Sequence, residues 1–218
     1  GDVYKRQTLY IAEARALTGM FYFELVRRFG NVVLMTSTQM SNQNPATYVQ
    51  SAPEKVYEYI EDDLLYACDI LPYATDDQYR ESNDYRFSKG AALGLLTKVY
   101  ATWAGYPVKD ESKWEAAAKT ARILVESGKH GLLKDYEQLW KNTCNGTWDP
   151  TESLIEISFY SPTVSGNSDP VGRIGKWNGV KTTAIAGVRG SCAANVKVVH
   201  TFVLDWREDV SDIRRDLS

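Results

Sequence analysis

The stretch from Thr8 to Thr36 constrains the fold of this chain more than any other. Four of its charged residues share one arc of a helix with 3.6 residues per turn: Glu13, Glu24, Arg27 and Arg28. The other positions are mostly apolar, so we expect a helix that is covered on more than one flank. Gly30 can adopt the left-handed conformation that ends a helix, and the apolar run at 32–35 is typical of a buried extended segment.

The size and charge of the chain exclude several classes of protein. With 218 residues, 44% of them hydrophobic, it can bury one sizeable core. Its formal net charge of −3 supplies no global basic field for nucleic acid. No apolar run approaches the roughly 20 residues of a membrane-spanning helix, and the first residues contain no signal-peptide core.

The sequence divides into three parts. Residues 1–7, GDVYKRQ, do not fit the helical pattern that follows, and we expect them to be a leader of non-native origin. Residues 8–145 have the pattern of a helical domain. Residues 146–218 are rich in loop and strand signals, and we expect them to be an incomplete elaboration of that domain.

The second helix is expected between Ser51 and Leu71. Ser51 and Glu54 have the spacing of a capping box, with Pro53 in the first turn, and Pro72 stops the helix. One apolar stripe is expected to face the core: Val56, Ile60, Leu64, Ala67 and Leu71. The opposite side is predicted to be an acidic, solvated face: Glu54, Glu58, Glu61, Asp62, Asp63 and Asp69.

Two more helices complete a repeated pattern. The segment 87–105 has an apolar stripe, and its small residues predict a close approach of another helix backbone (Gly90, Ala91, Gly94 and Ala101). Ser112 and Glu115 predict a second capping box, for a helix with Trp114 facing inward and Gly128 at its end. Consecutive pairs of helices indicate a mostly α fold of tetratricopeptide-like hairpins.

Three of these helices carry a family resemblance. The segments AEARALTGMFYFELVRRFGNVVLMT, APEKVYEYIEDDLLYACDILP and FSKGAALGLLTKVY resemble signature helices of the SusD/RagB proteins, the surface glycan-binding lipoproteins of Bacteroidetes. The match departs from the family at Ala16 and Thr18. The resemblance implies non-catalytic oligosaccharide binding, delivery to a SusC-like TonB-dependent transporter, and a lipid anchor at the extracellular face of the outer membrane.

The last third of the chain has a different pattern. A short helix is expected at 136–141, a strand at 154–160 and a helix at 196–206. Between residues 161 and 194 there are eight glycines and prolines, which predicts an elaborated surface region.

Cysteine and histidine are too scarce for a metal site. Cys68 lies on an apolar helix and is expected to be a core residue. Cys144 and Cys192 lie in loop-like sequence, and whether they pair in an oxidising compartment stays open. We expect no metal, no cofactor and no catalytic nucleophile.

Sugar binding requires flat aromatic faces, together with amides or guanidinium groups for the hydroxyls. Side chains of these types occur in or beside the glycine-rich region, and they form our candidate glycan site: Trp177, Asn178, Arg173, Tyr160, Trp148 and Arg189. For Trp177 the alternative is an anchor that packs the loop onto the helical body. A second candidate contact region is the loop 37–50, with Asn42, Asn44 and Tyr48. Trp103, Trp114 and Trp140 have helical spacing and are expected in the core.

Two other classes of function remain as alternatives. Paired carboxylates at 62–63 and 76–77 could suggest a glycosidase, but adjacent acids on a helix face and in a turn are more often structural. A tetratricopeptide-type scaffold that binds peptides would instead present polar and basic side chains on its inner helix faces.

Overall fold

The structure, a computed structural model, describes residues 2–37, 44–76, 85–157, 177–178, 181–186, 191–208 and 211–212. The chain forms two compact units. The first contains residues 1–134 and 141–156, and the second contains residues 135–140 and 157–218. The domain limits that we expect from the sequence remain a prediction.

The first helix, α1, is the longest element of the first unit and runs from Asp2 to Phe29. Gly30 ends it as expected, with a φ of 67° and a backbone N–H that donates to the Val26 carbonyl oxygen at 2.9 Å. The start differs from our expectation, because residues 2–7 continue the helix without a break.

A short antiparallel ladder follows α1. β1 (Val32–Val33) pairs with β2 (Gln50–Ser51), with Val32 opposite Ser51. The ladder explains why the capping box predicted at Ser51 is wrong: this residue belongs to a strand, and the helix cap falls on Ala52, whose side chain can accept no hydrogen bond.

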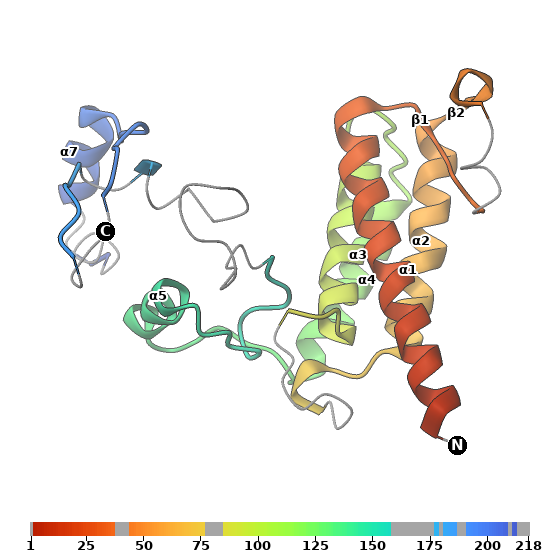
Figure 1. Cartoon of the computed structure of the whole chain (residues 1–218), viewed down its shortest axis with the longest axis horizontal. Coiled ribbons are helices and arrows are strands. Elements are labelled where there is room, and N and C mark those ends of the chain that lie inside the picture. Colours follow the sequence, from red (N-terminus) through yellow and green to blue (C-terminus); the bar gives the residue numbers. More distant parts are fainter. Residues whose placement is uncertain are drawn as a thin grey trace. The chain divides into compact units, whose positions relative to one another are not determined.

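The second helix, α2 (Pro53–Ile70), begins at the predicted proline and ends before Leu71. The predicted apolar stripe is confirmed, because its five residues are all buried. α2 packs along α1 (Figure 1), and Gly19 permits the close approach, since a Cβ there would lie 3.1 Å from Leu64 Cγ.

The third helix, α3 (Lys89–Ala104), is capped by Ser88, whose hydroxyl oxygen accepts from the Ala91 N–H at 3.2 Å. Its apolar stripe and Trp103 are buried, as expected. The expected contact of its glycines with a helix backbone is wrong. A Cβ at Gly90 would lie 2.1 Å from His130 Nε2, and one at Gly94 would lie 2.6 Å from Leu154 Cδ1, so side chains from the following segments fill this space.

The fourth helix, α4 (Lys113–Glu126), completes the second hairpin, and Gly128 follows it with a φ of 63°. Its predicted capping box is also wrong, because the Ser112 hydroxyl donates to Asp110 Oδ1 at 2.5 Å instead of capping the helix. Trp114, expected to face inward, is 53% exposed.

The helices pack in the order of the chain: α1 on α2, α2 on α3 and α3 on α4. Figure 1 shows these four helices side by side. The mostly helical fold of tetratricopeptide-like hairpins with a small β part is therefore confirmed.

The remaining described elements are short. η2 (Pro45–Thr47) and η3 (Ala74–Asp76) are 3-10 turns, α5 runs from Tyr136 to Asn145, and α7 runs from His200 to Glu208. α5 confirms the short helix expected at 136–141, and α7 begins later than the helix expected at 196–206. The strand expected at 154–160 is not formed at residues 154–157, where Ile155 packs on the helical core, and residues 158–160 lie outside the described residues.

Two cysteine predictions have different outcomes. Cys68 is a buried core residue, as expected. Burial raises the pKa of its thiol to about 12. The side chain of Cys144 lies outside the described residues, so whether it pairs with Cys192 stays open.

Candidate functional site

Trp177 and Asn178 form the described part of the candidate glycan site. Both are in helical conformation in the second unit. The Trp177 carbonyl oxygen accepts a hydrogen bond from the Val196 N–H at 3.1 Å, which fixes the backbone of this turn. The Trp177 side chain is nevertheless 42% exposed, and Asn178 is exposed beside it. An aromatic side chain and an amide are therefore both accessible to solvent on a tethered backbone.

The described structure does not place the other predicted residues relative to this turn. Tyr160, Arg173 and Arg189 lie outside the described residues. Trp148 is half-buried and belongs to the first unit, and its indole nitrogen is buried with no hydrogen-bond partner among the described residues. The Trp148 group that could donate to a sugar hydroxyl is thus withdrawn from solvent.

Trp140 is a candidate that our sequence analysis assigned wrongly to the core. It is 51% exposed on α5, and residues 135–140 belong to the same compact unit as Trp177. The available signal was composition: the sequence YEQLWKNTCN of α5 is mostly polar and offers too few apolar neighbours to bury an indole.

The loop proposed as a second contact region is described only in part. Asn42 lies outside the described residues, and Asn44 uses its side-chain oxygen to accept from the Ala46 N–H at 3.0 Å, as the cap of η2. Tyr48 is half-buried. The side-chain oxygen of Asn44 is therefore already used in a hydrogen bond within the loop.

The paired acids at 62–63 are bound by a single arginine of α1. Arg15 donates from Nε to Asp63 Oδ1 at 2.6 Å and from Nη2 to Asp62 Oδ2 at 2.5 Å. The same guanidinium lies 4.4 Å from the centre of the Tyr66 ring. The expected solvated acidic face is thus wrong at Asp63, which is 4% exposed.

Burial changes the pKa of Asp63. It raises the pKa of this carboxyl, and the hydrogen bond from Arg15 offsets only part of the effect. Asp63 Oδ2 is buried and has no hydrogen-bond partner among the described atoms. The arrangement ties α1 to α2 and leaves no pair of carboxylates at 62–63 free to flank a glycosidic bond.

A second charged cluster ties α2 to the other hairpin. Lys113 Nζ lies 3.1 Å from both carboxylate oxygens of Glu61 and 3.8 Å from the centre of the Trp103 ring. Tyr100 donates its hydroxyl to Glu61 Oε1 at 2.7 Å, and burial together with this bond raises the pKa of Tyr100. Tyr57 stacks on Trp103 with ring centres 5.2 Å apart. Because Trp103 is buried, these aromatic rings stabilise the packing of the helices.

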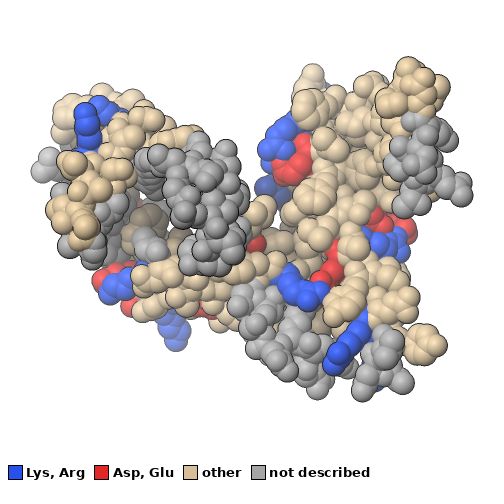
Figure 2. All heavy atoms as spheres, viewed as in Figure 1, with Lys and Arg blue, Asp and Glu red and all other residues tan. Residues whose placement is uncertain are grey.

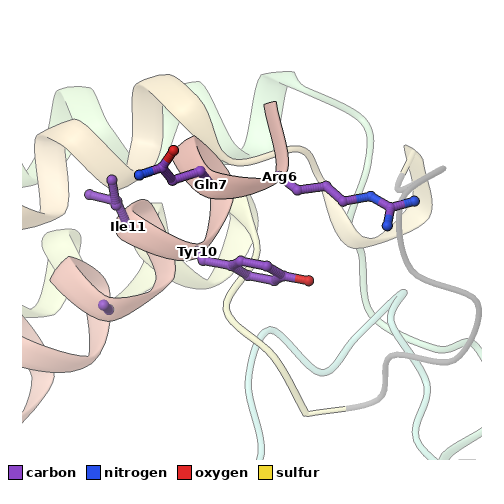
Figure 3. A pocket seen from close by; sticks show the side chains of 5 residues that line it. Arg6, Gln7, Tyr10 and Ile11 are labelled. Atoms are coloured by element: carbon purple, nitrogen blue, oxygen red, sulfur yellow. The ribbon is translucent and has the colours of Figure 1, made fainter. Parts of the chain in front are cut away.

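The frame also has a surface hollow of about 630 Å³ on α1. The lining residues that the structure describes all come from this one helix: Arg6, Gln7, Tyr10, Ile11 and Ala14 (Figure 3). A small-molecule site normally has walls from several elements that converge on the ligand. The described part of this hollow has one wall and is an open helix surface.

Within the described residues, histidine, cysteine, aspartate and glutamate side chains nowhere form a group of three or more that could hold a metal ion. Over the same residues, no helix is both long and apolar enough to span a membrane.

The comparisons with known proteins agree on one family. Residues 4–101 match the family model SusD-like_3, described as "Starch-binding associating with outer membrane". A SusD-like protein of Bacteroides ovatus is 28% identical over 183 residues, which cover 79% of this chain and 32% of that protein.

Solved structures give the same result. A crystal structure of a SusD homolog from Bacteroides thetaiotaomicron is 98% identical with a TM-score of 0.91, covering 99% of this chain and 40% of that one. A structure solved with xylogluco-oligosaccharide is 31% identical with a TM-score of 0.57, covering 72% of this chain and 30% of that one.

The chain thus spans less than half the length of these relatives. The matched family model and the shared fold agree with the helix signatures read from the sequence. The chain therefore belongs to the SusD/RagB family.

Proposed function

We propose that this protein binds oligosaccharides without cleaving them, and that its second unit makes the contact. The single observation that carries the proposal is the half-exposed ring of Trp177, held on a hydrogen-bonded turn beside the exposed amide of Asn178. A flat aromatic face can stack on the apolar side of a pyranose, and an amide can both donate to and accept from its hydroxyls.

Family membership supports the choice of ligand. One relative of known structure was solved with xylogluco-oligosaccharide, and the family model is described as starch-binding. These descriptions belong to those proteins, so the sugar bound here is part of the proposal. Trp177, Asn178, Arg173, Tyr160 and Arg189 remain our proposed contacts in the second unit, and Trp140 joins them because it is exposed in the same unit as Trp177. Trp148 belongs to the first unit and is not part of this proposed contact.

The proposal includes a cellular role. A protein of this family would hold its sugar at the outer face of the outer membrane, attached through an N-terminal lipid, and pass it to a SusC-like TonB-dependent transporter. The description of the matching family as associated with the outer membrane supports this location.

The chemistry of the acids supports binding without catalysis. A glycosidase needs one carboxyl to donate a proton and a second to act as base or nucleophile. Asp62 and Asp63 share Arg15, and Asp76 pairs with Lys129 at 2.8 Å. Each of these acids already has a partner within the frame.

Affinity gel electrophoresis tests the proposal on a family-length protein that contains these residues. Gels cast with xyloglucan, starch or laminarin would be compared with gels that contain no polysaccharide. We expect retardation on at least one polysaccharide without release of reducing ends. Trp177→Ala and Asn178→Ala should reduce the retardation.

Trp114→Ala is the matched control, because Trp114 is similarly accessible but lies on α4 of the helical frame. Equal losses in Trp177→Ala and Trp114→Ala would contradict the assignment to the second unit. Release of reducing ends by the pure protein would contradict the absence of catalysis, and no retardation on any polysaccharide would favour a protein-binding scaffold.

A further inference from the structure

Two segments of the first unit, residues 129–133 and 149–153, are joined by hydrogen bonds, and we call this arrangement the clip. Its bonds connect three pairs of residues at 2.6–2.9 Å: Gly131 with Thr151, Leu133 with Glu152, and His130 with Pro150. The chain leaves the first unit after residue 134 and again after residue 156. The clip therefore ties together the approaches to both crossings.

His130 is the side chain of the clip whose charge can change near neutral pH. The Pro150 carbonyl oxygen can only accept a hydrogen bond, so Nδ1 of His130 carries a proton and Nε2 is the unprotonated nitrogen of the neutral ring. Nε2 is buried and has no hydrogen-bond partner among the described residues. The closed clip thus requires only the neutral imidazole.

The surroundings of Nε2 offer no acceptor for a second proton. A Cβ at residue 90 would lie 2.1 Å from Nε2, so this nitrogen lies directly against the backbone of Gly90 in the first turn of α3. The N–H groups at the start of a helix carry partial positive charge. Protonation of Nε2 would therefore place a buried positive charge at the positive end of α3.

The charged groups of the packed segments do not compensate for such a charge. Lys89 Nζ lies 5.8 Å from the centre of the Tyr73 ring, and the His130 ring lies 5.8 Å from the same ring, so a lysine is already present on this side. Figure 2 shows acidic and basic side chains next to one another at several places on the first unit. The acids of the segments packed here also have partners: Asp76 with Lys129, Glu152 with the Leu133 N–H, and Asp149 with the Thr151 N–H.

We propose that His130 makes the clip a proton-sensitive switch, which is closed while the imidazole is neutral and opens when Nε2 takes up a proton. In the open clip the ring reaches water, so protonation is costly only in the closed form. The closed form is therefore favoured above the titration range of histidine and loses population as the pH falls through that range. Opening would release both ends of the segment that carries α5 and Trp140. The switch does not depend on sugar binding.

Hydrogen exchange in the 218-residue chain tests the proposal at about pH 7.5 and about pH 5.5. The amides of Gly131 and Leu133 report on the clip, after correction for the intrinsic effect of pH on exchange. We expect opening to become about tenfold or more frequent at the lower pH, because a buried charge without a partner weakens the closed form. The amide of Ile60, in the core of α2, controls for global unfolding.

Two variants isolate the histidine. His130→Asn keeps an amide N–H close to the position of Nδ1 and cannot be protonated in this pH range, so we expect its clip to show no added opening at the lower pH. His200→Asn is the matched control, because His200 is the other histidine of the chain and is exposed on α7. It should retain the pH dependence of the wild type. Asp63, whose pKa is raised by burial, is present in all three proteins and cancels from the comparison.

The imidazole Cε1–H signals in NMR spectra of the wild type, assigned with the two variants, show the pH at which each histidine is protonated. The midpoint of clip opening should coincide with the protonation of His130. Opening that follows His200 instead, that persists unchanged in His130→Asn, or that does not change between the two pH values would overturn the proposal. Because the NMR comparison uses the wild type, it decides the question even where His130→Asn leaves the clip open at both pH values.

Discussion

Gly90→Ala gives the most informative perturbation of the helical frame. A Cβ at this position would lie 2.1 Å from His130 Nε2, 2.8 Å from Cδ2 and 2.9 Å from Cε1, which are all too close for van der Waals contact. The imidazole is not free to move away. Its Nδ1 donates to the Pro150 carbonyl oxygen at 2.9 Å, and its ring lies against Tyr73.

The expected change in the free energy of unfolding is the sum of two costs and one gain. Overpacking at a buried site costs about 1–3 kcal/mol. Displacing the imidazole costs about 1 kcal/mol more for its hydrogen bond to Pro150. Alanine favours the helix over glycine by at most about 1 kcal/mol, and by less in the first turn of α3, where Gly90 lies. We expect a net loss of about 2 kcal/mol in the free energy of unfolding, or a fall in Tm of about 4–8 °C.

A double-mutant cycle with His130→Ala isolates the contact. Urea denaturation of the four proteins, followed by far-UV circular dichroism, gives each free energy of unfolding. Once the imidazole is absent, Gly90→Ala should become neutral or stabilise the protein by up to about 1 kcal/mol. Equal destabilisation in both backgrounds would refute the steric argument, as would a stabilising effect of Gly90→Ala alone.

Three further predictions concern the buried polar groups. Because burial raises the pKa of Asp63, the contribution of this carboxyl to stability is largest at acid pH and is lost as the pH rises through its folded pKa. The difference in free energy of unfolding between the wild type and Asp63→Asn should therefore fall as the pH is raised from about 4. Urea denaturation of both proteins between about pH 4 and 7 measures this difference, and a difference that does not change with pH would contradict the prediction. Lys113→Met removes the cation between Glu61 and Trp103 and should cost about 1–3 kcal/mol in urea denaturation, whereas an exposed pair would cost under about 1 kcal/mol. Since burial raises the pKa of Cys68 to about 12, iodoacetamide at about pH 8 should alkylate its peptide only after unfolding, and rapid labelling of the native protein would argue against the burial.

Local patterns predicted the helices well because each helix needs one apolar stripe. The stripe of α2 and the glycine ends at Gly30 and Gly128 required only helical spacing and the conformational freedom of glycine. The family signature could be read from the same segments. These features are properties of residues close together in the chain.

The errors arose where partners are distant in sequence. Ser51 could have capped α2, but its pairing with Val32 placed it in a strand. Asp63 was expected to be solvated because its partner, Arg15, lies 48 positions away in the sequence. Helical spacing alone also could not tell that Trp114 faces outward, because that depends on where the hairpin ends.

Which residues contact the sugar stays a prediction. The accessible ring of Trp177 agrees with the expectation of an exposed aromatic, whereas Trp140 was missed because its helical spacing was taken as a core signal. Loop composition identifies residue types suited to a sugar, but their spatial grouping depends on tertiary contacts that composition does not encode.

The central claim is that the helical frame is structural and that the second unit recognises the sugar. The most direct measurement is the dissociation constant of the family-length protein for the polysaccharide that retards it, compared between Trp177→Ala and Trp114→Ala. Loss of one stacking contact of about 1–2 kcal/mol predicts that Trp177→Ala weakens binding about 5- to 30-fold, while Trp114→Ala leaves the constant unchanged. Unchanged affinity in Trp177→Ala, together with weakened affinity in Trp114→Ala, would contradict the account.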